Sequence, residues 1–127
     1  MSQQSISLKE FPSFWLKLFP EFRESEKYDE ENIEIPYAFL ADYSRFFMDR
    51  LKSGGETDIV VQRTFNIMNK IFNDPSAEPE VINLIQIELC EILASSKKGL
   101  ELANKLLEGD SVKYLKMACN WLNSVDD

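Results

Sequence analysis

The stretch at residues 36–53, PYAFLADYSRFFMDRLKS, decides the fold class of this chain. Its large side chains recur at the spacing that places them on one buried face of an α-helix. This stripe comprises Phe39, Leu40, Tyr43, Phe46, Phe47, Arg50 and Leu51. Proline suits the first turn of a helix and glycine suits its end, so Pro36 and the pair Gly54-Gly55 mark the boundaries. The pattern predicts a long amphipathic helix over residues 36–53.

Helical patterns continue on both sides of this stretch, separated by proline and glycine. Apolar spacing predicts further helices at about residues 8–19, 58–72, 79–94, 99–107 and 111–124. The helix at 79–94 is apolar on almost every side, which predicts that it lies at the centre of the fold. Only residues 33–37 could form a strand, and Pro36 argues against one there. With 4 glycines and 5 prolines, the chain is also poor in the tight turns of sandwiches and barrels.

We therefore expect an all-α fold in which residues 1–127 form a single compact helical domain of about six or seven helices. A chain of 127 residues that is 44% hydrophobic is sufficient for one core. Two architectures are compatible with the pattern. The short loops after residue 57 predict antiparallel neighbours, which form either a bundle or stacked helix pairs like those of HEAT and armadillo repeats.

The sequence contains no histidine, and this absence excludes whole classes of catalytic site. Ser-His-Asp and Cys-His pairs, imidazole acid–base catalysis and HExxH zinc sites all need histidine. Carboxylates one helical turn apart, such as Glu88 and Glu91, are more typical of ordinary surface pairs than of acid–base catalysis. Asp42 is expected to form an ion pair with Arg45 or Arg50. We expect neither enzymatic activity nor a bound metal or cofactor.

The net charge of −8 arises from 22 acidic and 14 basic residues and is concentrated in two segments. Residues 21–34 include seven acids and two basic residues, and the stretch between Lys70 and Lys97 contains five acids and no basic residue. This distribution argues against nucleic acid and anionic membranes, which both require lysine or arginine. It favours a basic protein partner, because matched fields speed association, although a solvated acidic surface explains such runs equally well. The run at 29–34 lacks the ligand spacing and central glycine of a calcium loop.

Nothing in the sequence points to a membrane or to secretion. No apolar stretch is long enough to span a bilayer, and the N-terminus lacks the basic and apolar regions of a signal peptide. Both cysteines, Cys90 and Cys119, lie in apolar helical patterns and are expected to be buried free thiols. We therefore expect a cytoplasmic location.

Two stretches in the first half of the chain resemble a known family. Residues 14–22, FWLKLFPEF, are followed by acidic residues, and residues 38–47 read AFLADYSRFF. They are similar to the FPEF segment and the GD-x-x-RF helix of small, acidic, helical bacterial proteins, with Ala41 in place of the glycine. Members of this family look like immunity proteins of toxin systems, including contact-dependent growth inhibition. The resemblance covers roughly residues 1–50.

The resemblance implies a protein that stays in the cytoplasm of the toxin-producing cell, binds the toxin domain and occludes its active site. Many such toxins are nucleases, and an acidic surface can fill a basic nuclease groove by imitating phosphate charge. On this hypothesis the partner contacts come from both acidic segments: Glu21, Glu24, Glu26, Asp29, Glu30, Glu31, Glu34, Asp74, Glu78 and Glu80.

The alternative hypothesis is a helical scaffold or adaptor that holds a peptide or a regulatory partner in a groove between its helices. The first predicted helix carries more aromatic residues, Phe14 among them, than one packed face needs. Aromatic side chains dominate the most strongly contributing positions of protein interfaces, so some of these residues could line such a groove. The two hypotheses differ in their dependence on salt, which weakens electrostatic capture but has little effect on an apolar groove.

Overall fold

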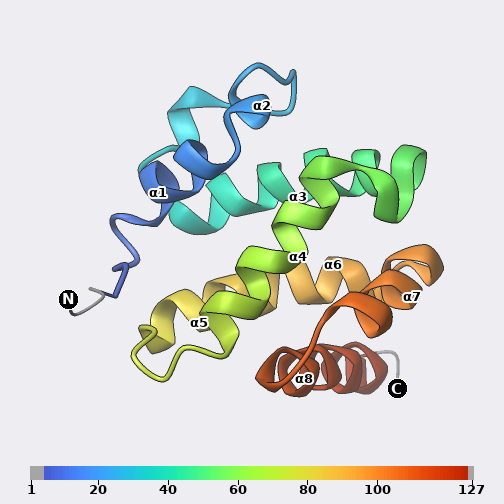
Figure 1. Ribbon diagram of the computed structural model, residues 1–127. Helices are drawn as coiled ribbons and strands as arrows, with labels where there is room; N and C mark the ends of the chain where they lie inside the picture. The colour runs from blue at the N-terminus through green and yellow to red at the C-terminus, as the bar shows by residue number, and fades with distance from the viewer. Residues whose placement is uncertain (1–4, 126–127) are drawn as a thin grey trace.

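The computed structural model describes residues 5–125, and the regular structure within this range is entirely helical (Figure 1). The elements, in chain order, are α1 (Phe11–Leu18), α2 (Pro20–Arg23), η1 (Glu30–Asn32), α3 (Pro36–Gly54), η2 (Gly55–Thr57), α4 (Ile59–Phe72), α5 (Pro79–Ile85), η3 (Gln86–Cys90), α6 (Glu91–Ala94), α7 (Lys97–Leu106) and α8 (Asp110–Val125). The prediction of an all-α fold is confirmed. η1 and η2 are 3-10 turns, whereas η3 is a π-helical segment that joins α5 to α6 in one continuous helix.

The best-predicted boundaries are those where the chain supplies a cap, a proline or a glycine. α3 extends one residue beyond the predicted range, and Gly55 ends it with a φ of 59°, a conformation that favours glycine. Asp58 caps α4 by accepting hydrogen bonds from the amides of Val60 (2.8 Å) and Val61 (3.1 Å). Both boundaries follow directly from local sequence.

The first helix begins later than its apolar spacing predicts, at Phe11 instead of residue 8. Ser7 and Glu10 form a reciprocal capping box, with the Ser7 amide donating to the Glu10 carboxylate (3.1 Å) and the Glu10 amide to the Ser7 hydroxyl (3.2 Å). Within this turn the amides of Glu10 and Phe11 bond to carbonyls three residues back. The segment before Phe11 is therefore tighter than an α-helix.

The helix predicted from residue 99 begins earlier, at Lys97, because the Ser96 hydroxyl caps it by accepting from the Gly99 amide (3.2 Å). Gly99 lies inside α7 and touches α6. A side-chain carbon at this position would lie 2.9 Å from the Leu93 carbonyl oxygen. Glycine, usually a helix terminator, is thus kept here by close packing between two helices.

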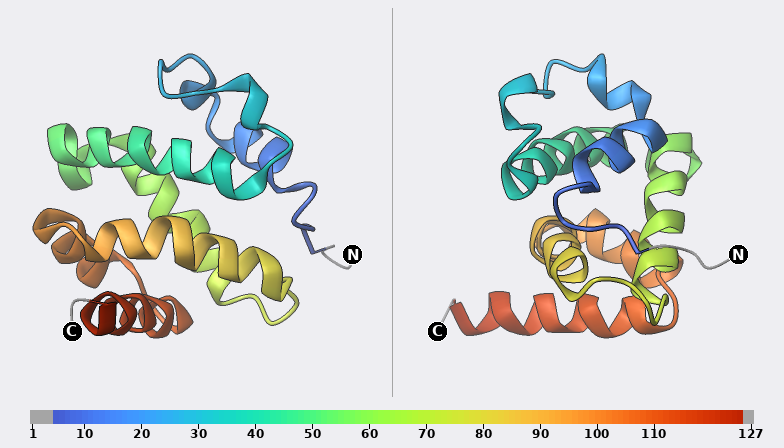
Figure 2. Two further views of the ribbon diagram at one scale, coloured as in Figure 1. Left: turned by 180° about the vertical axis from the view of Figure 1, so that it is seen from behind. Right: turned by 90° about the vertical axis from the view of Figure 1, so that its left-hand side faces the viewer.

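The helices pack as successive antiparallel pairs. α3 pairs with α4, the continuous helix α5–η3–α6 pairs with α7, and α3 lies against the continuous helix (Figure 2). α8 runs across one end of this stack and contacts α4, η3 and α6. α1 lies at the opposite end against α3, with α2 beside it. The arrangement is closer to stacked helix pairs than to a bundle with aligned axes.

Aromatic side chains fill the space between α1, α2 and α3. Tyr43 lies at the centre of this cluster, and its ring contacts those of Trp15, Phe19, Phe22 and Phe46 at centroid distances of 5.0–5.6 Å. Tyr43, Trp15, Phe19 and Phe22 are completely buried. Tilted and edge-to-face pairs of this kind stabilise a core beyond the area that they bury. The cluster holds α1 and α2 on α3, and so determines where the acidic segment after α2 lies.

The continuous helix α5–η3–α6 lies at the centre of the fold, as predicted. It contacts α3, α4, α7 and α8. Its buried residues are Val81, Leu84, Ile85, Leu89, Cys90 and Leu93. In η3 the Glu91 amide bonds to the Gln86 carbonyl, five residues back instead of four. One side of the helix still faces solvent, where the Ile87 side chain is 37% exposed.

Candidate functional site

The first acidic segment forms the surface that follows α2. Six of its acids are exposed: Glu24, Glu26, Asp29, Glu30, Glu31 and Glu34. Because α2 has only four residues, the chain leaves the core early and continues as a loop and the 3-10 turn η1. Asp29 caps this turn by accepting from the Glu31 amide (3.0 Å), and Glu30 accepts from the Tyr28 hydroxyl (2.6 Å). These local bonds order the loop and leave its carboxylates at the surface.

Glu21 differs from its neighbours because it links two helices of the fold. Arg63 of α4 donates to Glu21 Oε1 (2.9 Å) and to the Leu18 carbonyl (3.0 Å), and its guanidinium lies over the Phe19 ring. Burial alone would raise the pKa of Glu21, but hydrogen bonding and the charge of Arg63 outweigh it, so this pKa is lowered. The Glu21 carboxylate is thus already engaged within the chain.

Acids from the two distant segments border the same groove. Glu34 precedes α3, and Glu80 lies in the first turn of α5. Both line a groove of about 880 Å³, together with the basic residue Lys9 and apolar residues that include Leu8 and Ile33. We call it the Glu34–Glu80 groove. Folding therefore brings together two acidic segments that the sequence separates.

A second groove adjoins the first along the N-terminal segment. Ser5 and Ile6 line the second groove, and the next residue along the chain, Ser7, lines the first. The second groove has a volume of about 580 Å³ and is bordered by two further predicted acids, Asp74 and Glu78. We call it the isoleucine groove. The term acidic edge is used below for the acids along both grooves and the adjoining turn: Asp29, Glu30, Glu31, Glu34, Asp74, Glu78 and Glu80.

Not every predicted site residue joins the acidic edge. Glu24 and Glu26 are exposed but lie on the loop that follows α2, and neither is among the residues that line the two grooves. Glu21 is held by Arg63, as described above. The other predicted acids make up the edge, so folding divides the original set into an edge, a neighbouring loop and one structural ion pair.

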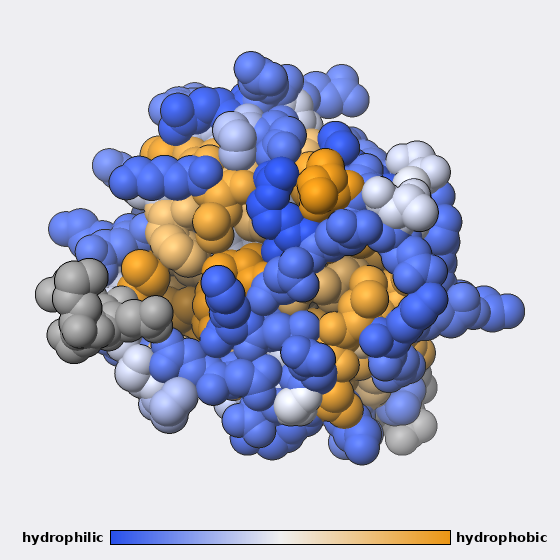
Figure 3. Space-filling model, in the orientation of Figure 1, coloured by the Kyte–Doolittle hydropathy of each residue, from blue (hydrophilic) through white to orange (hydrophobic). Residues whose placement is uncertain are grey.

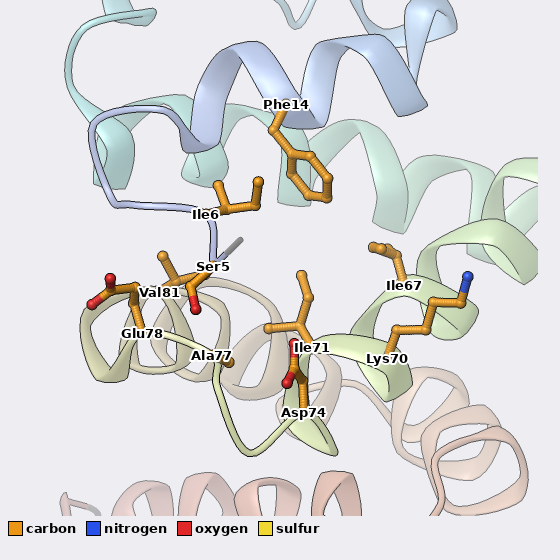
Figure 4. Close-up of a pocket in the computed structure, with 10 residues that line it drawn as sticks. All are labelled: Ser5, Ile6, Phe14, Ile67, Lys70, Ile71, Asp74, Ala77, Glu78 and Val81. Carbon is orange, nitrogen blue, oxygen red and sulfur yellow. The ribbon is translucent and has the colours of Figure 1, made fainter. Parts of the chain in front are cut away.

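Apolar side chains from four parts of the chain wall the isoleucine groove (Figure 4). Ile6 comes from the N-terminal segment, Phe14 from α1, Ile67 and Ile71 from α4, and Val81 from α5. Figure 3 shows apolar surface on this face, near the N-terminal end of the chain and surrounded by hydrophilic residues. Phe14 points toward the groove, which agrees with the expectation that an aromatic residue of the first helix lines one.

A separate polar cluster surrounds Arg45 on α3. Asp42 is buried, forms the expected ion pair with Arg45, and accepts a hydrogen bond from the Asn32 side chain (2.8 Å). Burial raises the pKa of Glu88, the charge of Glu91 raises it further, and Arg45 lowers it. Among residues 5–125, no three acidic or cysteine side chains lie close enough to share a metal ion. The ion pair gives Asp42 a structural role.

The two cysteines differ in burial. Cys90 in η3 is buried, as expected, and burial raises the pKa of its thiol to about 12. Cys119 on α8 is a free thiol, as expected, but it is only partly buried, so the expectation that it is buried is wrong. This difference arises because one flank of α8 lies at the surface. With so high a pKa, Cys90 is protonated at neutral pH and therefore a poor nucleophile.

Comparisons with known proteins assign no family to the chain. No protein-family model, no curated protein and no solved structure matches it. Within residues 5–125, none of the helices combines the length and the hydropathy that crossing a membrane requires.

Proposed function

We propose that this chain is an immunity protein that binds and neutralises a basic toxin domain in the cytoplasm, without catalytic activity of its own. The observation that carries this proposal is the acidic edge, where Glu34 and Glu80 from two distant segments border one groove. Solubility requires surface charge, but it does not require acids from distant segments to gather around apolar grooves. The resemblance of residues 14–22 and 38–47 to immunity proteins supports the same function.

Electrostatics favours a partner of opposite sign at this edge. Nucleases bind phosphate through lysine and arginine, so their substrate grooves attract clustered carboxylates. Such attraction speeds association and weakens with salt, because exposed charges are screened beyond about 10 Å at 0.1 M ionic strength. An acidic protein seated over a nuclease groove would exclude the nucleic acid by occupying its place. Inhibition on this proposal needs no chemistry from the chain.

An immunity function predicts that a gene for a basic toxin domain lies beside the gene for this chain, and the test uses the product of that neighbouring gene. Co-expression of the chain should restore growth of cells that produce the toxin domain. For the purified pair, the double variant Glu30→Lys with Glu31→Lys should associate roughly tenfold more slowly at low salt, and the difference should disappear at high salt. The matched control reverses two exposed charges at α7 and beyond its end, Glu101→Lys with Glu108→Lys, and should keep the wild-type rate.

Two results would contradict different parts of this proposal. Failure of the folded wild-type chain to protect toxin-producing cells, or to bind the toxin domain, would refute the immunity function. Protection combined with an association rate that is unchanged by Glu30→Lys and Glu31→Lys at low salt would refute steering by the acidic edge. An equal loss in the control variant would show that total charge matters and position does not.

A further inference from the structure

The isoleucine groove is built from segments that other contacts hold in place. Its N-terminal wall is tied to the loop before α5 by a hydrogen bond from the Ser5 hydroxyl to the Ser76 carbonyl. Its upper wall is held by α1, where the Phe14 ring lies 6.3 Å from the ring of the buried Phe11. A preformed groove of about 580 Å³ is within the size range of sites that accept a compact ligand or a large side chain.

The rim of this groove carries charges of both signs. In Figure 4, Glu78 borders it on the left, Asp74 lies at its lower edge and Lys70 borders it on the right. Asp74 Oδ1 accepts hydrogen bonds from the Ser76 hydroxyl (2.7 Å) and amide (2.9 Å), which hold the pKa of Asp74 below its ordinary value. Within residues 5–125, no hydrogen bond uses the second carboxylate oxygen, Oδ2. An ionised acceptor thus lies next to an apolar groove.

We infer, on the basis of the proposed capture of a basic partner, that the isoleucine groove receives one large apolar side chain of that partner while an adjacent arginine or lysine pairs with Asp74. Charge complementarity selects this occupant, because the groove adjoins the Glu34–Glu80 groove and a basic surface over one also covers the other. An apolar anchor in a pocket beside charged contacts concentrates binding energy at a few positions. The groove then provides specificity, while the surrounding acids speed association.

A set of synthetic peptides separates the anchor from the charge. The first peptide carries one tryptophan flanked by arginines in a glycine–serine background, the second has alanine in place of tryptophan, and the third has glutamates in place of arginines. NMR shifts of the isoleucine methyl groups locate binding, because Ile6, Ile67 and Ile71 line the groove and Ile59 is exposed outside it. We expect the first peptide to bind below about 1 mM and the others at least about thirtyfold more weakly.

Variants of the full chain test the rim and the wall. Asp74→Asn keeps an acceptor for Ser76 but removes the charge, so it should weaken binding of the first peptide about tenfold. Lys70→Glu removes the opposing charge and should tighten binding. Ile67→Lys should abolish binding, whereas the matched control Ile59→Lys, on an exposed side of the same helix, should preserve it. Circular dichroism identifies any variant that fails to fold, and the two rim variants test the inference independently of Ile67.

Three outcomes would overturn the inference, and they separate it from the proposed function. If the alanine peptide binds as tightly as the tryptophan peptide without shifting the groove methyls, the anchor is wrong while capture of a basic partner stands. If the glutamate peptide binds as tightly as the arginine peptide, selection by charge is wrong and the groove behaves as that of an adaptor. If no peptide shifts the groove methyls at about 1 mM, the groove is not a docking site.

Discussion

The hydroxyl of Tyr43 is a polar group at the centre of the aromatic cluster. It lies 2.6 Å from the Thr64 hydroxyl, which in turn donates to the Val60 carbonyl (2.7 Å). Since the proton of Thr64 is used in that second bond, Tyr43 is the donor to Thr64. Burial raises the pKa of Tyr43 above its ordinary value, so the group stays protonated and able to donate.

Replacement of the two partners should therefore have unequal costs. Thr64→Val leaves the buried Tyr43 hydroxyl without an acceptor and should lower the free energy of unfolding by about 1–3 kcal/mol. Tyr43→Phe leaves Thr64 bonded to Val60 and should cost only about 1 kcal/mol. Urea unfolding measures both, and the double variant should cost less than the two single variants together. A smaller loss for Thr64→Val than for Tyr43→Phe would contradict this assignment of donor and acceptor.

Glu88 is an acid whose environment favours the neutral form. Burial raises its pKa, and Glu91 adds to that effect against the opposing charge of Arg45. The folded state therefore binds a proton at Glu88 more tightly than the unfolded state does. The stability that this group contributes is present below the unfolded pKa of 4.5 and is lost as pH rises through the higher folded value.

Neutralising Glu88 should consequently stabilise the protein at neutral pH. We expect Glu88→Gln to raise the free energy of unfolding by about 0.2–0.5 kcal/mol at pH 7, because a neutral amide removes both the cost of partly burying a charge and the repulsion from Glu91. At a pH of about 4 the gain should disappear, since the wild-type carboxyl is then largely protonated. Chemical unfolding at both pH values measures this, with Glu101→Gln as an exposed control. A gain that persists in acid would show that charge is not its cause.

At the scale of the element, Asp58 connects the start of α4 with the side of α3. It caps α4 through two amides, and its carboxylate accepts from Arg50 Nε at 3.1 Å. Burial alone would raise the pKa of Asp58, but the Arg50 hydrogen bond and the amides outweigh it and lower the pKa. Its contribution to stability is therefore present above the unfolded value of 3.8 and is lost as pH falls through the lower folded value.

Removal of this cap should destabilise the helix pair measurably. Asp58→Ala should lower the free energy of unfolding by about 1–2 kcal/mol at pH 7, and Asp58→Asn should cost less because an amide oxygen can still cap. Thr57→Ala is the neighbouring control, because the Thr57 hydroxyl donates to the Gly54 carbonyl within the preceding turn. Thermal unfolding as a function of pH should show the difference between wild type and Asp58→Ala shrinking in acid. A difference that does not depend on pH would contradict the proposed role of the carboxylate.

Helix boundaries are predicted well from the sequence where a nearby proline, capping residue or glycine marks them. Pro36, Asp58 and the pair Gly54-Gly55 at the end of α3 act within one turn of the boundary that they mark, so the limits of α3 and α4 could be predicted closely. The π-helical segment η3 could not, because it adds one residue to a turn without changing the composition around it. The predicted start of α7 was two residues late, and the close contact between Gly99 and Leu93 of another helix could not be predicted from the sequence around it.

At the scale of the whole molecule, the acids of the candidate site could be predicted but their neighbours could not. Acidic residues can be counted directly in the sequence, so the two acidic segments, which contain Glu34 and Glu80, can be recognised from the sequence alone. Their meeting across one groove depends on the packing of α3, α5 and the N-terminal segment, which is long-range information. The walls of the isoleucine groove were missed for the same reason. Only Phe14 gave a signal, as a surplus aromatic residue in the first helix.

The two tryptophans provide an optical view of both ends of the stack. Trp15 is 0% exposed within the aromatic cluster, whereas Trp121 on α8 is 53% exposed. The buried Trp15 should emit at shorter wavelengths than the exposed Trp121. Dissolved iodide should quench the emission of Trp121 and leave that of Trp15 unchanged. A Trp121→Phe variant isolates the signal of Trp15, and subtraction from wild type isolates the signal of α8. Coincident melting curves from the two signals would show that the opposite ends of this chain unfold as one cooperative unit.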